Sequence, residues 1–132
     1  MQGIGNRSWL AGVMLVGALV MKARGDTAKW IAALAAAAKA DEMVVHLGPP
    51  NTYPPHELLG DALLALGRAQ EAIVAYSKGL ELMPNRSLTL LGLARAQRMV
   101  GDVAAAVKTE AQLRENWRRA DARATSRLAS VR

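Results

Sequence analysis

Apolar residues recur in the chain at intervals of three and four positions, which is the spacing of one face of an α-helix. The clearest example lies near the C-terminus, at Leu113, Trp117, Ala120, Ala124, Leu128 and Val131. Most arginines of the same segment fall on other faces, so we expect an amphipathic helix there. This helix would close the fold and be held to it by Trp117.

Two kinds of break divide the helical pattern. Glycine followed by a polar residue occurs at Gly25-Asp26, Gly67-Arg68 and Gly101-Asp102, where glycine favours the left-handed C-cap of one helix and aspartate the N-cap of the next. Four of the five prolines fall within residues 49–55, and no helix crosses such a stretch because each proline ring removes a donor and clashes with the preceding turn. We therefore expect one helical unit at 8–45 and a longer one beginning near His56.

The longer unit contains an internal repeat with a period of 34 residues. Shifting the sequence by 34 positions aligns Gly67 with Gly101 and Ala72 with Ala106. Gly25 stands 42 positions before Gly67, which fits a third copy enlarged by the proline-rich insertion. A period of this length is typical of stacked helix pairs.

A helix–turn–helix period of 34 residues is that of the tetratricopeptide repeat, and the residues agree with that family beyond the period. The copy at 53–86 resembles the family pattern in Leu59-Gly60, Gly67, Ala72, Tyr76 and Pro84. The proline-rich loop followed by a last repeat is similar to the C-terminal region of bacterial tetratricopeptide-repeat proteins.

The next copy keeps Leu93-Ala94, Gly101 and Ala106, but it has Glu110 at the aromatic position. The resemblance implies that Ala18, Gly60 and Ala94 lie where the two helices of a pair cross, with Ala72 and Ala106 facing them, because small residues permit close approach. It also implies that Tyr76 fills the gap to the following pair.

The resemblance implies an all-α fold of antiparallel helix–turn–helix pairs, stacked as a short right-handed superhelix with a C-terminal capping helix. Within a single domain at 1–132, the expected order is a degenerate helix pair at 8–45, a proline-rich loop at 46–55, a repeat at 53–86, a second repeat at 87–116 and a basic capping helix at 117–132.

Composition supports helices and removes several kinds of site. Alanine and leucine, 26 and 18 residues, make up a third of the 132, whereas there are 13 valines and isoleucines and no phenylalanine, so an all-β fold is excluded. The absence of cysteine excludes disulfides and thiolate chemistry. The net charge of +6 lies mainly in residues 114–132, with six basic and two acidic side chains, so no general basic surface is expected.

An uncharged segment at residues 9–21 opens the helical pattern. It is shorter than the roughly 20 residues that a bilayer core requires, so we expect a first helix packed into the fold. A signal or anchor within residues 1–23 is the alternative, and it would give a secreted, periplasmic or membrane-anchored protein. The first interpretation favours a cytoplasmic location.

No set of residues points to catalysis, a cofactor or a metal. His46 and His56 are the only histidines, and the run that His56 opens lacks the second histidine that a zinc-peptidase helix places four positions on. The serines lack a nucleophile elbow, and the glycines near the N-terminus follow no strand. We therefore expect a non-enzymatic protein.

The resemblance implies a groove, on the first helices of the pairs, that binds a peptide or partner protein. The corresponding positions are Glu57, Asp61 and Leu64 in the best copy, Leu91, Arg95 and Arg98 in the next, and Leu15, Leu19 and Lys22 in the first. Arg95 and Arg98 suit an acidic peptide, and a solvated helix face is the alternative. The mixed charges do not match the clamp that some family members use for C-terminal carboxylates.

A second candidate surface is the arginine set of the capping helix, which would suit an anionic partner. Its members are Arg114, Arg118, Arg119, Arg123 and Arg127. Because Glu115 and Asp121 offset two of these charges, a solvated cap is favoured over nucleic-acid binding. The rival function is a membrane- or nucleic-acid-associated accessory protein, and a homo-oligomer through the apolar segment 9–21 is a further alternative.

Overall fold

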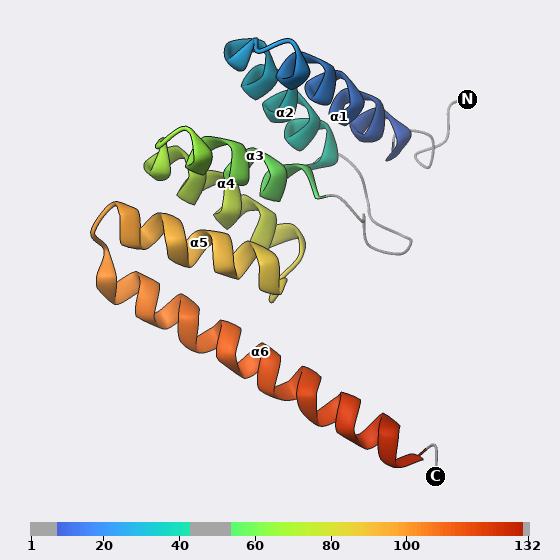
Figure 1. The fold of residues 1–132 in the computed structure, drawn as a ribbon, viewed down its shortest axis with the longest axis vertical. Coiled ribbons are helices and arrows are strands. Elements are labelled where there is room, and N and C mark those ends of the chain that lie inside the picture. Colours follow the sequence, from blue (N-terminus) through green and yellow to red (C-terminus); the bar gives the residue numbers. More distant parts are fainter. Residues whose placement is uncertain (1–7, 43–53, 131–132) are drawn as a thin grey trace.

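The computed structural model describes residues 8–42 and 54–130, and within these ranges it contains α-helices and no strand (Figure 1). The helices are α1 (Ser8–Ala23), α2 (Thr27–Glu42), α3 (Pro55–Ala65), α4 (Ala69–Leu82), α5 (Ser87–Met99) and α6 (Val103–Ser130). The predicted all-α fold is confirmed.

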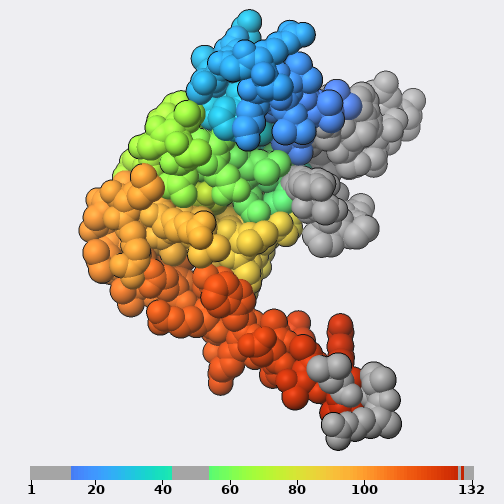
Figure 2. Space-filling view, in the orientation of Figure 1, coloured from blue at the N-terminus to red at the C-terminus, as the bar shows by residue number. Residues whose placement is uncertain are grey.

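Consecutive helices form pairs, and the pairs stack in chain order into a curved body (Figures 1 and 2). α1 packs against α2, α3 against α4 and α5 against α6, while α2–α3, α4–α5 and α3–α5 contacts join one pair to the next. Ala18, Leu34 and Ala62 form an apolar cluster shared by α1, α2 and α3. The body is therefore continuous from the first pair to the last.

The turns within the pairs have the predicted chemistry. Gly25, Gly67 and Gly101 have φ angles of +74°, +74° and +83°, in the left-handed region that glycine adopts without strain. The Oδ1 atoms of Asp26 and Asp102 each accept a hydrogen bond of 3.1 Å from the backbone N–H three residues on. These caps end one helix and start the next within a few residues.

The proline-rich break falls between the first and second pairs. Pro54 has an extended backbone, and Pro55 is the first residue of α3, a position where a missing N–H costs nothing. The predicted loop at 46–55 therefore ends one residue earlier than expected. His46 and the rest of that loop lie outside the described residues.

Tyr76 of α4 occupies the centre of the stack. The side chain is fully buried between Gly60 of α3 and Gly92 of α5. A methyl group on Gly60 would lie 2.6 Å from Tyr76 Cε1, so neither glycine leaves room for a side chain as the ring stands. Ala18, Gly60, Ala72, Ala94 and Ala106 are all buried, as close packing of small residues requires.

The expected capping helix at 117–132 is not a separate element. α6 runs without interruption from Val103 to Ser130, because this segment contains no glycine or proline that would end a helix. Leu113 is buried, but Trp117 is 51% exposed, and so the expectation that Trp117 holds a cap to the body is wrong. Figure 2 shows the C-terminal part of α6 projecting from the body.

Replacing Gly60 by alanine should destabilise the fold by about 1–3 kcal/mol, since the new methyl group overlaps the Tyr76 ring. Gly17→Ala is the matched control, because a methyl group at Gly17 meets nothing within 4 Å. This substitution should raise the free energy of unfolding by about 0.5–1 kcal/mol, since alanine has the higher helix propensity. Urea unfolding followed by circular dichroism measures both. Equal stability of the two variants would contradict the close packing at Tyr76.

Candidate functional site

An apolar cavity of about 700 Å³ lies between α1, α2 and α3. Its walls are Leu15, Val16, Ala18, Leu19, Trp30, Leu34, Leu58, Ala62 and Ala65, and its polar residues are Lys22 and Asp61. The volume falls within the range of roughly 300–1,000 Å³ that is usual for ligand sites. Four residues assigned to the groove by register, Leu15, Leu19, Lys22 and Asp61, are thus brought together.

The exposed wall of this cavity comes from α1. Ala18 is buried against α2 and α3, whereas Val16 and Leu19 are about three-fifths exposed. Within residues 13–21 the expectation that segment 9–21 packs into the fold is therefore right for the face that carries Ala18 and wrong for the face that carries Val16 and Leu19, and the side chains of residues 9–12 lie outside the described residues. Exposed apolar side chains beside an apolar cavity are typical of a binding surface.

The two polar residues of the cavity each interact with an aromatic side chain. Lys22 Nζ lies 5.1 Å from the centroid of the Trp30 ring, close enough for a cation–π interaction. The Tyr76 hydroxyl donates a hydrogen bond of 2.5 Å to Asp61 Oδ1. Burial raises the pKa of the Asp61 carboxyl, and the Tyr76 hydrogen bond opposes this shift. Asp61 thus connects the cavity to the centre of the core.

Glu57 is not a groove residue, contrary to expectation. Its side chain is 9% exposed, and its Oε2 atom accepts hydrogen bonds of 2.6 Å from both Arg86 Nε and Thr89 Oγ1. Arg86 and Thr89 lie at the start of α5, so this carboxylate joins the first turns of two helices. Its Oε2 atom is thus engaged inside the protein.

The other predicted groove residues differ in their accessibility. Leu64 and Leu91 are half-buried, and Leu64 packs against the cluster around Tyr76. Arg95 is exposed, and its charge lowers the pKa of Asp61, which places the two residues in one electrostatic environment. Arg98 instead forms a two-pronged ion pair with Glu110 of α6, with N–O distances of 2.5 and 2.9 Å. Arg95 therefore acts electrostatically on Asp61, whereas Arg98 is paired with Glu110.

The arginine set of α6 is exposed, and several of its charges are matched within the helix. Arg118 and Arg119 both pair with Glu115, at 2.8 and 3.0 Å. Arg114 lies 3.9 Å from Glu110. Arg123 and Arg127 complete the set on the exposed end of the helix. Pairing with carboxylates leaves fewer arginines available to a polyanion than the sequence suggested.

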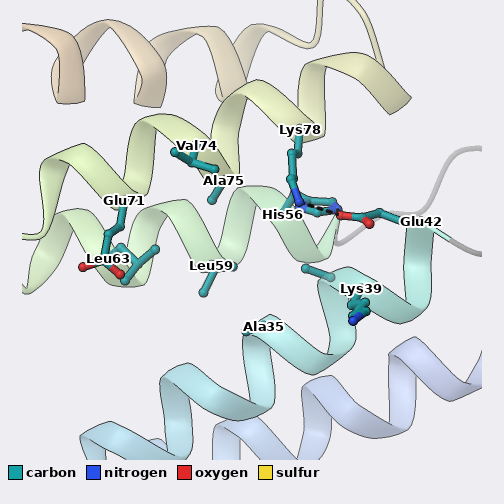
Figure 3. Close-up of a pocket in the computed structure, with 11 residues that line it drawn as sticks. Ala35, Lys39, Glu42, His56, Leu59, Leu63, Glu71, Val74, Ala75 and Lys78 are labelled. Atoms are coloured by element: carbon teal, nitrogen blue, oxygen red, sulfur yellow. Dashed lines mark ion pairs between the residues drawn. The ribbon is translucent and has the colours of Figure 1, made fainter.

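A second cavity, of about 440 Å³, lies between α2, α3 and α4 (Figure 3). His56, Glu42, Lys78 and Lys39 gather at one end of it. This cluster is not predicted from the sequence. The repeat pattern relates equivalent residues of successive copies, and it does not show which residues of neighbouring helices come together. One local signal existed, since Lys39 and Glu42 are three positions apart on a helix and share a face.

His56 is the buried member of this second cavity. Its side chain is 4% exposed, and neither ring nitrogen forms a hydrogen bond with another side chain of the described residues. Glu42 Oε1 lies 3.2 Å from His56 Nε2 and 3.6 Å from Lys78 Nζ. Burial lowers the pKa of His56, although the charges of Glu42 and Asp41 partly oppose the shift. The lowered pKa favours the neutral form of the imidazole.

The described residues contain neither a candidate metal site nor a candidate membrane-spanning helix. Within 8–42 and 54–130, no group of three or more histidine, cysteine or acidic residues is placed to hold a metal ion. Across the same ranges, none of the helices combines the length and the apolar character needed to cross a membrane.

Comparison of the sequence with models of known protein families and with curated proteins finds no match to either.

Replacing Glu57 by glutamine should lower the free energy of unfolding by about 1–3 kcal/mol, because two short hydrogen bonds to a buried carboxylate are weakened. Glu71→Gln is the control, since Glu71 pairs with Arg68 in full contact with water and should change stability little. Chemical denaturation measures both variants. A Glu57→Gln protein as stable as the parent would show that this carboxylate does not tie α3 to α5.

The lowered pKa of His56 should make the protein less stable in mild acid. The unfolded chain binds a proton at this residue near pH 6.5 and the folded chain only at lower pH, so His56 lowers stability progressively as the pH falls below 6.5. His56→Gln should therefore flatten the dependence of unfolding free energy on pH between 7 and 5. Parallel curves for the parent and the variant would contradict the shift.

Proposed function

We propose that this protein is a non-enzymatic interaction module of the tetratricopeptide-repeat type, which binds a peptide or a partner protein in a groove along α1, α3 and α5. Three helix pairs stacked in chain order support the proposal, as do the glycine-capped turns and the small residues at the helix crossings. In such a stack the first helices of successive pairs line one side, and that side serves as an extended binding surface.

The observation that carries the proposal is the apolar cavity between α1, α2 and α3. It lies on helices of two successive pairs, and the residues that line it include four of the groove positions that the family resemblance implies. A monomeric protein rarely leaves apolar side chains such as Val16 and Leu19 exposed beside an apolar cavity unless another molecule covers them.

The lining of the cavity defines the kind of peptide that fits. A bulky apolar side chain of the partner would occupy the apolar part, where burial contributes about 25 cal/mol per Å² of area removed from water. Lys22 at one position of the lining and Asp61 at another would contact polar groups of the peptide, and Arg95 adds a positive charge near Asp61. The groove therefore suits an apolar anchor residue flanked by polar or charged residues.

Replacing Leu19 by glutamate should weaken peptide binding by more than tenfold and leave the unfolding midpoint nearly unchanged, because Leu19 lines the cavity and is 63% exposed. A ligand is first selected from a displayed peptide library with the full chain, and fluorescence anisotropy then gives its dissociation constant. Val107→Glu is the matched control, since Val107 is 51% exposed on α6 and lies outside this cavity.

The arginines provide a second comparison in the same assay. Arg95→Glu should weaken binding of an acidic peptide, because Arg95 is exposed near Asp61. Arg98→Glu should not, because Arg98 is engaged with Glu110. If Leu19→Glu bound as tightly as the parent, or if Val107→Glu lost binding equally, the groove would not be the binding surface.

A further inference from the structure

We propose that the second cavity, between α2, α3 and α4, binds a small monocarboxylic acid with an apolar chain. The carboxylate would lie at the end formed by His56, Lys78 and Lys39, and the chain would extend over the apolar floor of the cavity. This site is separate from the groove in which a peptide is proposed to bind.

The internal contacts of the cavity show that its polar end accommodates a carboxylate. The carboxylate of Glu42 already stands there, with Oε1 at 3.2 Å from His56 Nε2 and 3.6 Å from Lys78 Nζ. It makes no hydrogen bond with the imidazole, and the Glu42 side chain is 37% exposed. A ligand carboxylate would take the same position between the imidazole and the ammonium group.

The buried imidazole is the second observation. A buried polar group without a hydrogen bond is costly, so an acceptor that satisfies it gains the full value of the bond. An imidazole N–H is a hydrogen-bond donor, and His56 is buried at the cavity with no side chain hydrogen-bonded to either nitrogen, its one hydrogen-bond partner among the described residues being the backbone of Ala38. A carboxylate oxygen accepts from such a donor.

The charges at this end favour an anion. Of the groups that line it, Lys39 and Lys78 carry positive charge and Glu42 carries negative charge, which leaves an excess of one positive charge. Asp41 also acts on the imidazole electrostatically, but it is buried and does not line the cavity. Glu71 lines the far end, where Arg68 holds it in an ion pair.

The remaining lining defines the rest of the ligand. Leu59, Val74 and Ala75 lie between the polar end and Leu63 (Figure 3), and Ala35 and Ala38 of α2 form the opposite wall. A saturated chain of several carbons would cover this strip and remove both surfaces from water. A volume of about 440 Å³ suits a small molecule.

The two cavities use different faces of the same helix. Leu58, Asp61, Ala62 and Ala65 of α3 line the apolar cavity, whereas His56, Leu59 and Leu63 line this one. The two sites therefore share no lining residue, and the two proposals are tested independently.

The test is titration of the full chain with sodium octanoate at millimolar concentrations, followed by calorimetry and by the His56 imidazole resonances. We expect saturable binding of one octanoate per chain, and weaker binding of octanol and octylamine, which have the same chain without a carboxylate. Affinity should rise from acetate through butyrate to octanoate as more of the apolar strip is covered.

The variants distinguish this site from general adsorption of an apolar anion. Lys78→Met should weaken octanoate binding about fivefold, while Glu42→Gln should strengthen it by a similar factor, because the competing carboxylate is removed. Lys108→Met on α6 is the control and should leave binding unchanged. Equal binding of octanoate and octylamine, absence of saturation, or the same affinity for the Lys78 and Glu42 variants would overturn the proposal.

Discussion

The burial of a single tyrosine ring between two glycines sets the spacing of the helix stack. Tyr76 reaches from α4 to Gly60 of α3 and Gly92 of α5, so three helices from two pairs meet on one side chain. Its hydroxyl would be an unsatisfied polar atom in the core, and the hydrogen bond to Asp61 removes that cost. The same bond makes the packing of the core and the polarity of the groove interdependent.

Apolar packing has little directional preference, and polar contacts supply the orientation of one pair against the next. Glu57 joins the first turn of α3 to Arg86 and Thr89 at the start of α5. Asn85, in the turn before α5, has a left-handed backbone, and its carbonyl accepts a hydrogen bond of 2.7 Å from Asn116 of α6. These contacts hold the beginning of α5 from both sides.

Features that depend on the local chain could be predicted from the sequence, and features that depend on neighbouring helices could not. Helix ends follow from glycine and aspartate chemistry, and the small residues to which the family resemblance assigns close packing are buried. The same resemblance assigned Glu57 and Arg98 to the groove, because it carries no information about partners such as Glu110 on another helix. The expectation that Trp117 holds a cap to the body is wrong because an apolar stripe shows which face of a helix is apolar, but not whether another helix covers that face. The cluster around His56 joins three helices and has no sequence period at all.

Because α6 is uninterrupted from Val103 to Ser130, its packed part and its projecting part belong to one helix, but their backbone hydrogen bonds are protected from solvent in different ways. Up to Leu113 its amides are protected by packing on α5, so they exchange with solvent when the body of the protein opens. Beyond Asn116, whose side chain still donates to the Asn85 carbonyl, the helix depends on its own hydrogen bonds and on pairs such as Arg118 with Glu115, which salt screens. Amide exchange should therefore quicken gradually toward Ser130, and the outer half of the helix would unwind and reform while the body stays folded.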